Sequence, residues 1–311
     1  MKNIQKVFLA EPRGFCAGVV RAVDIAEKAL EVFGPPVYVR REIVHNSFVV
    51  QGLRDKGVFF VDELDEVPDG SLTIFSAHGV SPEVRSIADK NNLNIIDATC
   101  PLVTKVHLEA VKFAREGYSI ILVGHDGHDE VIGTIGEAPH ATQLVSDLQQ
   151  AEDVSIPDPD KVAVITQTTL SLDDTTSIID VLRRRFPNLV VPTKSDICFA
   201  TQNRQNAVKK MTESVDLILV IGADNSSNSL RLQEVSEEYN CTSYLIDSAT
   251  KIDSNWFDNA HRVGVTSGAS TPDYLVEEVC EYFKQNGVES FEIIRDSTED
   301  VFFPLPRELS I

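Results

Sequence analysis

Three of the five cysteines in this sequence occupy the same kind of position, and their thiolates could share one metal centre. Cys16, Cys100 and Cys198 each follow a short apolar run and precede a segment with the apolar periodicity of an amphipathic helix. The positive N-terminal end of a helix stabilises a thiolate, which is the form of cysteine that binds metals. The matched positions therefore predict that these three cysteines act together.

Zinc and a 4Fe-4S cluster are the two metal groups that three thiolates could bind. Structural zinc usually takes four protein ligands, often from close CxxC pairs, whereas these cysteines are widely separated in the sequence. Three thiolates would leave one iron of a 4Fe-4S cluster open, and an open iron can bind a hydroxyl group as a Lewis acid. The spacing favours one 4Fe-4S cluster with three cysteine ligands and one open iron site, and zinc remains the alternative.

The other two cysteines fit a structural role. Cys280 shares one face of a predicted helix with Val279 and Phe283, and Cys241 precedes the apolar segment 243–246. Free cysteine is commonly a small buried hydrophobe, so neither residue is expected to bind metal. Because the number of cysteines is odd and no CxxC pair occurs, we expect no disulfide framework and a reducing, cytoplasmic location.

Histidines and small polar residues follow apolar segments throughout the chain and could form an anion site. They form a shell that is rich in hydrogen-bond donors but lacks Lys and Arg, and such a shell can hold a phosphate group. Some residues of the run 225–229 also suit the capping of a helix, although five polar residues exceed what a cap requires. The members of this predicted substrate-binding shell are His45, His78, His128, Thr168, Thr169, Ser226, Ser227, Asn228 and Ser270.

Three similar α/β units are needed to position these residues. Each copy reads strand, cysteine, helix, strand and polar cluster, and a further strand follows that also ends in polar residues. Strands that alternate with helices predict parallel sheets, which bind ligands beyond the carboxyl ends of their strands. We expect three α/β lobes with mostly parallel sheets, in a pseudo-three-fold arrangement around the cluster. The expected divisions are 1–98, 99–194 and 195–285, followed by a tail, 286–311, that packs back on the body.

The acidic stretch that contains Glu130 supplies the candidate proton donor. A carboxyl group beside a metal centre and a bound anion can act as a general acid. Glu130 is preferred because its neighbour His128 occupies the position in its repeat that Ser226 occupies in another. Asp126 and Asp129 are the alternatives.

The charge of the chain excludes some classes of partner. There are 28 basic and 48 acidic residues, and the formal net charge of −20 repels nucleic acids and anionic membrane surfaces. The densest basic run, 183–185, lies at the end of a predicted helix, where it complements the helix dipole. The apolar run 7–10 is too short for the core of a signal peptide, and no segment is long enough to span a bilayer. We therefore expect neither nucleic acid nor membrane as a partner.

Nearly the whole chain carries motifs of one known family, in order. The motifs are Pro-Arg-Gly-Phe-Cys-Ala-Gly-Val at Cys16, Ile-Val-His-Asn at His45, Ser-Ala-His-Gly-Val at His78, Asp-Ala-Thr-Cys-Pro-Leu-Val at Cys100, Gly-His-Asp-Gly-His-Asp-Glu at Glu130, Thr-Gln-Thr-Thr-Leu-Ser at Thr168, Ile-Cys-Phe-Ala-Thr-Gln-Asn-Arg-Gln at Cys198, Asn-Ser-Ser-Asn-Ser at Ser226 and Gly-Ala-Ser-Thr-Pro-Asp at Ser270. Through them the sequence closely resembles the 4-hydroxy-3-methylbut-2-enyl diphosphate reductase (LytB) family, which acts last in the non-mevalonate (MEP) isoprenoid pathway.

The resemblance implies a three-lobed α/β fold and specific roles for the candidate residues. It implies a 4Fe-4S cluster on the three cysteines, and proton relay by Glu130 with Thr168 during reductive dehydroxylation of an allylic diphosphate. The residues that it implies for diphosphate binding are His45, His78, His128, Ser226, Asn228 and Ser270. The reaction consumes two electrons and two protons and yields isopentenyl and dimethylallyl diphosphate. We expect an external donor of the ferredoxin or flavodoxin type and a monomeric enzyme.

Departures from the family pattern are few. Glu11 stands where Asn is expected, Phe199 where Tyr is frequent, and Asp224 where Lys is common. A carboxylate at position 224 would weaken diphosphate binding unless it faces solvent. Two other classes stay open, which are a dehydratase similar to quinolinate synthase and a non-enzymatic iron–sulfur sensor. The first needs no external reductant, and the second needs neither Glu130 nor the phosphate shell.

Overall fold

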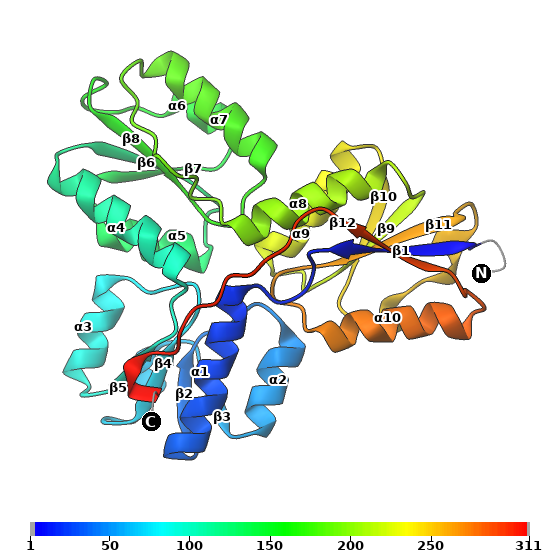
Figure 1. The fold of residues 1–311 in the computed structure, drawn as a ribbon. Helices are drawn as coiled ribbons and strands as arrows, with labels where there is room; N and C mark the ends of the chain where they lie inside the picture. Colours follow the sequence, from blue (N-terminus) through cyan, green and yellow to red (C-terminus); the bar gives the residue numbers. More distant parts are fainter. Residues whose placement is uncertain (1–3, 310–311) are drawn as a thin grey trace. The chain divides into compact units, whose positions relative to one another are not determined.

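Parallel strands form three sheets in residues 4–309, the part of the chain that the computed structural model describes (Figure 1). The five-stranded sheet has the order β10 (Thr242–Ile246), β9 (Leu217–Ile221), β11 (Arg262–Ser267), β1 (Lys6–Glu11) and β12 (Phe291–Arg295). The four-stranded sheet has the order β3 (Val58–Val61), β2 (Val37–Arg40), β4 (Leu72–Phe75) and β5 (Asn94–Asp97). The three-stranded sheet has the order β7 (Thr142–Val145), β6 (Ser119–Val123) and β8 (Val162–Thr166). The expected class, an α/β fold with three parallel sheets, is confirmed.

The chain divides into two compact units. The five-stranded sheet belongs to a unit built from residues 4–17, 45–49 and 199–302, which we call the five-stranded unit. The other two sheets belong to a unit built from residues 18–44, 50–198 and 303–309, which we call the two-sheet unit.

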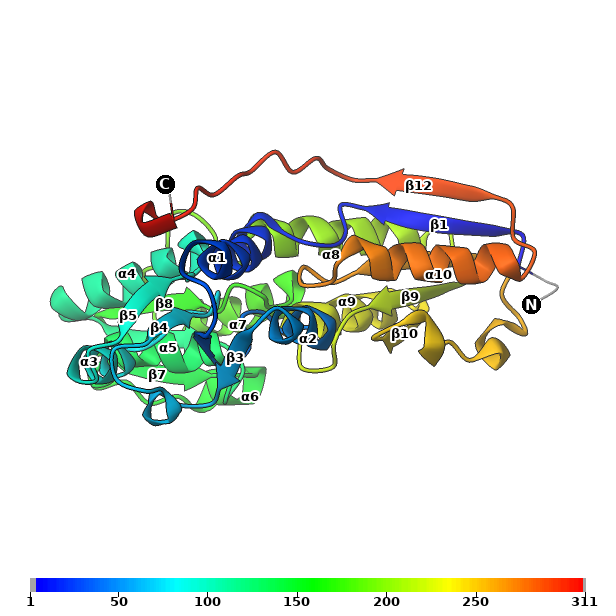
Figure 2. The same ribbon diagram turned by 90° about the horizontal axis from the view of Figure 1, so that it is seen from below.

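Helices cover both faces of the five-stranded sheet (Figures 1 and 2). Helices α8 (Phe199–Thr212) and α9 (Ser227–Glu238) pack on one face, and α10 (Asp273–Gln285) packs on the other. Successive side chains of a strand point to opposite faces of the sheet, so each face of β9 needs a covering layer. Leu219 packs with residues of α10 on one face, and Ile218 packs with residues of α8 and α9 on the other. A strand buried on both faces reads as a continuous apolar run, as this one does.

The two-sheet unit is built in the same way. Helices α4 (Pro101–Arg115) and α5 (Asp129–Glu137) pack on one face of the three-stranded sheet, and α6 (Leu148–Asp153) and α7 (Leu172–Arg185) on the other. The remaining helices are α1 (Ala17–Phe33), α2 (Ser47–Asp55) and α3 (Pro82–Lys90), with the 3₁₀ turns η1 (Leu64–Glu66), η2 (Ala249–Lys251), η3 (Ser254–Phe257) and η4 (Arg307–Leu309). Within the described residues, no helix is both long and apolar enough to cross a membrane.

The helices predicted after the three cysteines are present. Helix α1 begins directly after Cys16, Cys100 is the N-cap residue of α4 with Pro101 in its first turn, and α8 begins directly after Cys198. The basic run 183–185 forms the last turn of α7, as expected.

Two strands differ from their expected places. Strand β1, which the sequence groups with the first lobe, pairs with β11 and β12 in the five-stranded sheet. Its apolar pattern identifies a strand but carries no information about its neighbours, which lie far away in the sequence. The segment 189–192 is reduced to one isolated bridge between Val190 and Ala163. Pro192 lacks the backbone N–H that a longer ladder would need.

Candidate functional site

A buried acid and a hydroxyl group meet at the carboxyl end of β8. Glu130 lies in the first turn of α5 and is 6% exposed, and Thr168, two residues after β8, is 5% exposed. The backbone N–H of Thr168 donates to Glu130 Oε2 at 2.9 Å, and Thr168 Oγ1 donates to Glu130 Oε1 at 2.7 Å. Both carboxylate oxygens are therefore held by one residue, and a proton can move between the two side chains along the shorter bond.

Two histidines lie beside this acid. His128 caps α5, and its Nδ1 accepts the backbone N–H of Glu130 at 3.1 Å. An accepting Nδ1 carries no proton, so the proton of the neutral ring is on Nε2, which becomes its donor atom. The ring of His78 meets the ring of His128 edge-on, with centroids 6.0 Å apart. These two residues of the predicted shell are therefore neighbours within the two-sheet unit.

The two alternative acids are placed differently from Glu130. Asp126 is exposed, and Asp129 forms an ion pair with Arg41, which follows β2. Arg41 also pairs with Glu63 at 3.3 Å. Arg41 is not among the predicted site residues, and the predicted shell contains no Arg. The position of Arg41 directly after a parallel strand was the available signal.

Gln167 is a second residue that the sequence analysis did not single out. Its Oε1 accepts the backbone N–H of His125 at 3.0 Å, and its Nε2 donates to Thr169 Oγ1 at 3.0 Å. Gln167 therefore connects the loop that leads to His128 with the end of β8. The oxygen of Thr169 accepts this bond, so its hydroxyl group acts as a donor in any further bond that it makes.

The backbone fixes two of the three candidate metal ligands within the two-sheet unit. The N–H of Cys100 donates to the carbonyl oxygen of Ala77 at 2.9 Å, and the N–H of Cys198 donates to that of Thr168 at 3.0 Å. Ala77 directly precedes His78, and Thr168 bonds Glu130. Cys100 is thus bonded to the residue that precedes His78, and Cys198 is bonded to Thr168, the partner of Glu130.

A buried ion pair ties the Cys198 loop to the helix that starts at Cys100. Lys105 Nζ on α4 bonds Asp196 Oδ1 at 2.5 Å, and the side chain of Asp196 is 1% exposed. Asp196 Oδ2 accepts the backbone N–H of Thr166 at 2.9 Å. Burial, together with a hydrogen bond to Asp196, raises the pKa of nearby Glu109 to about 7. The network joins α4, β8 and the loop before Cys198.

Cys16, in the five-stranded unit, lies in a loop with several backbone bonds. Its N–H donates to the carbonyl oxygen of Ala269 at 3.1 Å, and the N–H of Gly14 donates to Ser267 Oγ at 2.8 Å. Gly14 has φ of +69°, and a Cβ atom at this position would lie 2.6 Å from Asp273 Oδ1. Only glycine adopts this positive φ without strain and leaves room for the Asp273 side chain.

The three junction cysteines differ from the other two in a way that suits metal binding. Burial raises the pKa of Cys241 and of Cys280, which disfavours their thiolates. Cys241 belongs to the apolar core beside α8 and α9, and Cys280 packs against the core beneath α10. The junction cysteines lie where helices begin, whereas Cys280 lies within α10 and Cys241 directly precedes β10. This donor set fits the iron–sulfur group that the resemblance implies.

Serines at the start of α9 surround a buried amide. Ser226 caps the helix, and its Oγ accepts a hydrogen bond from Ser229 Oγ at 3.1 Å. The hydroxyl hydrogen of Ser226 is therefore left to donate. Asn228 is 5% exposed, and among the described residues neither its Nδ2 nor its Oδ1 has a hydrogen-bond partner. A buried amide without partners is costly unless a ligand completes it. Asp224 is exposed, so its carboxylate faces solvent.

Ser270 has a different contact from the one the sequence predicts. Its Oγ donates to the carbonyl oxygen of His45 at 2.9 Å, so the hydroxyl already holds the neighbouring histidine loop. Asn46 fixes the same loop, because its Oδ1 accepts the N–H of Phe48 at 3.1 Å and that of Val49 at 3.2 Å. Direct donation from Ser270 to a phosphate requires its hydroxyl to rotate, whereas its contact with His45 needs no change.

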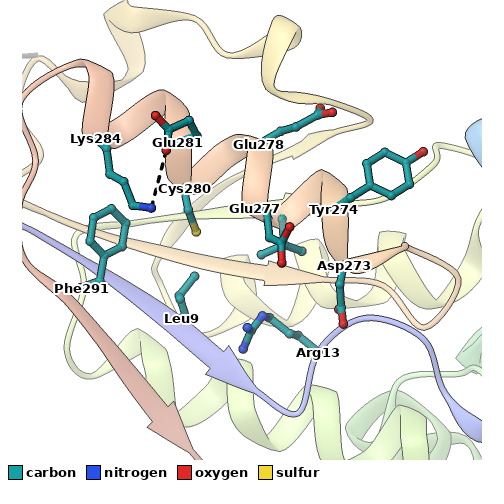
Figure 3. A pocket seen from close by; sticks show the side chains of 11 residues that line it. Leu9, Arg13, Asp273, Tyr274, Glu277, Glu278, Cys280, Glu281, Lys284 and Phe291 are labelled. Atoms are coloured by element: carbon teal, nitrogen blue, oxygen red, sulfur yellow. Dashed lines mark ion pairs between the residues drawn. The ribbon is translucent and has the colours of Figure 1, made fainter.

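A pocket elsewhere in the five-stranded unit has the wrong charge for a diphosphate. It has a volume of about 810 Å³ and lies between α10 and strands β1 and β12 (Figure 3). Its carboxylates outnumber its two basic side chains, Arg13 and Lys284, and no predicted site residue lines it. The predicted shell and this pocket are therefore separate.

Comparisons with known proteins agree with the motifs. The model of a family described as LytB protein matches residues 7–284. The 4-hydroxy-3-methylbut-2-enyl diphosphate reductase of Streptomyces coelicolor is 53% identical over 306 residues, which cover 98% of this chain and 90% of that protein. The enzyme of the same name from Pseudomonas putida is 52% identical over 310 residues, which cover 98% of both proteins.

Solved structures give the same result. The structure of the E-1-hydroxy-2-methyl-but-2-enyl-4-diphosphate reductase from Plasmodium falciparum is similar with a TM-score of 0.94 and 38% identity, over 99% of this chain and 97% of that one. A second structure, of an (E)-4-hydroxy-3-methyl-but-2-enyl diphosphate reductase described as the terminal enzyme of the non-mevalonate pathway, has a TM-score of 0.65 and 35% identity over 91% of this chain and 100% of the other.

Proposed function

Because the chain belongs to the LytB family of 4-hydroxy-3-methylbut-2-enyl diphosphate reductases, we infer that it performs their reaction. It reduces (E)-4-hydroxy-3-methylbut-2-enyl diphosphate to isopentenyl and dimethylallyl diphosphate, the last step of the non-mevalonate isoprenoid pathway. Two electrons and two protons enter, the C–O bond of the allylic alcohol breaks, and the oxygen leaves as water. The observation that carries this proposal is the buried pair of Glu130 and Thr168, bonded through both carboxylate oxygens.

The enzyme is an iron–sulfur protein, and we propose that Cys16, Cys100 and Cys198 bind one 4Fe-4S cluster with an open iron. Their helix-start positions support this set over Cys241 and Cys280, and burial raises the pKa of both of those thiols. When bound, such a cluster supplies electrons and a Lewis-acidic iron for the substrate hydroxyl. The protein contributes backbone bonds that fix each cysteine before the cluster binds.

Glu130 and Thr168 are proposed to deliver the proton that lets the hydroxyl oxygen leave as water. In the deprotonated state, Thr168 Oγ1 donates to Glu130 Oε1. When Glu130 is protonated this bond reverses, so that the acid donates to Thr168 and the hydroxyl hydrogen of Thr168 points onward. A relay of this kind needs the 2.7 Å contact that the pair has.

The polar shell is proposed to hold the diphosphate and thus to fix the position of the allylic hydroxyl. His128 is proposed to donate through Nε2, Ser226 through its hydroxyl and Asn228 through its Nδ2. These contacts orient the substrate without a fixed positive side chain. The full set proposed to bind substrate is His45, His78, His128, Thr168, Thr169, Ser226, Ser227, Asn228 and Ser270.

An electron donor must act with this enzyme, and we propose a small protein of the ferredoxin or flavodoxin type. We also propose that the enzyme works as a monomer in the reducing cytoplasm, where its thiols stay available for the cluster.

Anaerobic turnover tests the proposal directly. Protein purified under nitrogen is given the allylic diphosphate and reduced methyl viologen, and both diphosphate products are expected. Iron analysis of the same sample is expected to give one cluster per chain. Protein that carries its cluster but leaves the substrate unchanged would contradict the proposed reaction. Protein that turns over with zinc alone would contradict the proposed cofactor.

A further inference from the structure

Arg204 on α8 is the bulkiest of the fully buried side chains in the described residues, with 0% exposure. Its guanidinium contacts three separate parts of the five-stranded unit. Nη1 donates to the carbonyl oxygen of Ala200 at 2.8 Å and to Glu299 at 3.0 and 3.2 Å, and Nη2 donates to the carbonyl oxygen of Gly14 at 2.8 Å. The side chain of Glu299, in the segment after β12, is 15% exposed.

A buried charge of this kind needs a reason, because burial of an ion pair often costs as much as the attraction returns. Glu299, the partner of Arg204, also accepts a hydrogen bond from Asn203 Nδ2 at its Oε1, at 3.0 Å. The carbonyl group that Arg204 binds belongs to Gly14, two residues before Cys16. Gly14 is therefore bonded from both sides, at its N–H by Ser267 and at its carbonyl oxygen by Arg204.

The helix that carries Arg204 also begins directly after Cys198. One guanidinium thus joins the helix that follows one candidate ligand to the loop that carries another. The tail residue Glu299 balances its charge, which gives the segment after β12 a role beyond strand pairing.

We propose that Arg204 and Glu299 are positioning residues that hold the Cys16 loop in the geometry needed to bind the cluster. The inference rests on the proposed role of Cys16 as a cluster ligand. A guanidinium can bond three acceptors in a plane, and a lysine ammonium cannot reach all three from the same backbone position. Arg204→Lys therefore keeps the charge and removes part of the fork, and Glu299→Gln keeps the shape and removes the balancing charge.

The first measurement is hydrogen exchange of the cluster-free protein, because it does not depend on catalysis. In Arg204→Lys, the amides of Gly14 and Cys16 should exchange about tenfold faster or more, as expected when a charge-assisted hydrogen bond is lost. Amides of β9, β11 and α10 should exchange as in the parent. Arg183→Lys is the matched control, since Arg183 pairs with Asp180 on the surface of α7 and should change neither region.

The second measurement uses the cluster-loaded protein. Both variants should lose iron to a chelator faster than the parent does. Glu299→Gln should also move the reduction potential of its cluster to a more positive value, because an uncompensated guanidinium favours the electron-rich form. Glu152→Gln, which removes an exposed partner of Arg184, should leave both quantities unchanged.

The results separate the positioning role of Arg204 and Glu299 from the assignment of Cys16 as a cluster ligand. Parent-like exchange in the Cys16 loop of both variants would overturn the proposal, and so would faster exchange spread evenly over the unit, which indicates general destabilisation. Faster loop exchange with parent-like iron retention would overturn it as well. Cys16→Ser is measured beside them: if it keeps its iron, the ligand assignment is wrong, whatever the Arg204 variants show.

Discussion

The amide of Asn228 is the clearest residue-scale indication of where the diphosphate binds. Its two polar atoms are buried without a partner among the described residues, while the neighbouring Ser226 and Ser229 are bonded to each other. Most buried polar groups in native proteins have a partner, because an unsatisfied buried amide destabilises the fold, and a bound ligand can supply that partner. A bound phosphate oxygen would accept from Nδ2.

Replacing Asn228 by Leu should therefore change stability and binding in opposite directions. Leucine has a similar volume and buries no polar atom, so the substrate-free protein should melt at a higher temperature than the parent. The KM for the diphosphate should rise about tenfold or more, as for a lost hydrogen bond to a charged group. Thermal melts and anaerobic kinetics check the two parts. A variant with a parent-like KM would show that the anion does not contact this amide.

Individual site residues could be predicted unequally well. The sequence predicts Glu130 as the acid from its place in a repeat and a motif, and this stays a prediction. In the structure Asp129 is paired with Arg41 and Asp126 is exposed, whereas Glu130 is buried. The contact between Ser270 and the carbonyl oxygen of His45 could not be predicted, because no local pattern joins residues so far apart in the sequence. Arg41, by contrast, had a local signal, since it directly follows a parallel strand.

At the scale of elements, two close approaches place the start of α9. A Cβ atom at Gly222, which follows β9, would lie 2.1 Å from Ser229 Oγ and 2.5 Å from Ser229 Cβ. One at Gly268, which follows β11, would lie 2.1 Å from the same oxygen. Glycine at these two strand ends thus lets the helix start come close to the sheet.

Gly222→Ala should displace the start of α9 and weaken diphosphate binding. A clash with Ser229 Cβ cannot be relieved by rotation of the side chain, so we expect a higher KM together with a lower melting temperature. Gly52→Ala is the control, because Gly52 lies on α2 with no atom within 4 Å of the added carbon. It should keep the parent KM and gain about 0.5–1 kcal/mol of stability. Equal KM values in the two variants would contradict this account of α9.

The network around Asp196 makes a prediction about pH. Folding raises the pKa of Glu109 from 4.5 to about 7, by burial and by its hydrogen bond to Asp196. The folded state then binds more protons than the unfolded state between these two values, so stability falls as the pH rises through this window. Glu109→Gln should flatten that part of the stability profile and melt at a higher temperature than the parent at pH 8. Parallel profiles for the two proteins would show that Glu109 does not titrate in this way.

Elements were easier to predict than their pairings. The helices after the three cysteines begin where the sequence places them, because proline position and apolar periodicity are local signals. The pairing of β1 with β11 and β12 depends on packing between distant segments, and the pattern of β1 fits any sheet buried on both faces. The same limit applies to Val190, whose neighbourhood reads as a strand but forms one bridge.

At the scale of the whole molecule, the net charge of −20 affects the approach of an electron donor. An acidic donor protein is repelled until salt screens the charges, and the screening length is about 8 Å at 0.15 M ionic strength. With a flavodoxin at subsaturating concentration, the rate should rise as salt is added. With reduced methyl viologen, a radical cation, the rate should fall. A flavodoxin rate that falls with salt would show that a local basic surface outweighs the net charge.

The central claim is that Glu130 delivers the proton that breaks the C–O bond, and Glu130→Gln tests it most directly. Glutamine keeps the size of the side chain and most of its hydrogen bonding to Thr168, but it cannot deliver a proton. Product formation should fall by about 10²–10⁴, the usual loss when a general acid is removed. Cluster spectroscopy should still report bound substrate, because the cysteines and the polar shell are intact. A Glu130→Gln enzyme that turns over near the parent rate, with Asp129→Asn or Asp126→Asn inactive instead, would contradict the account.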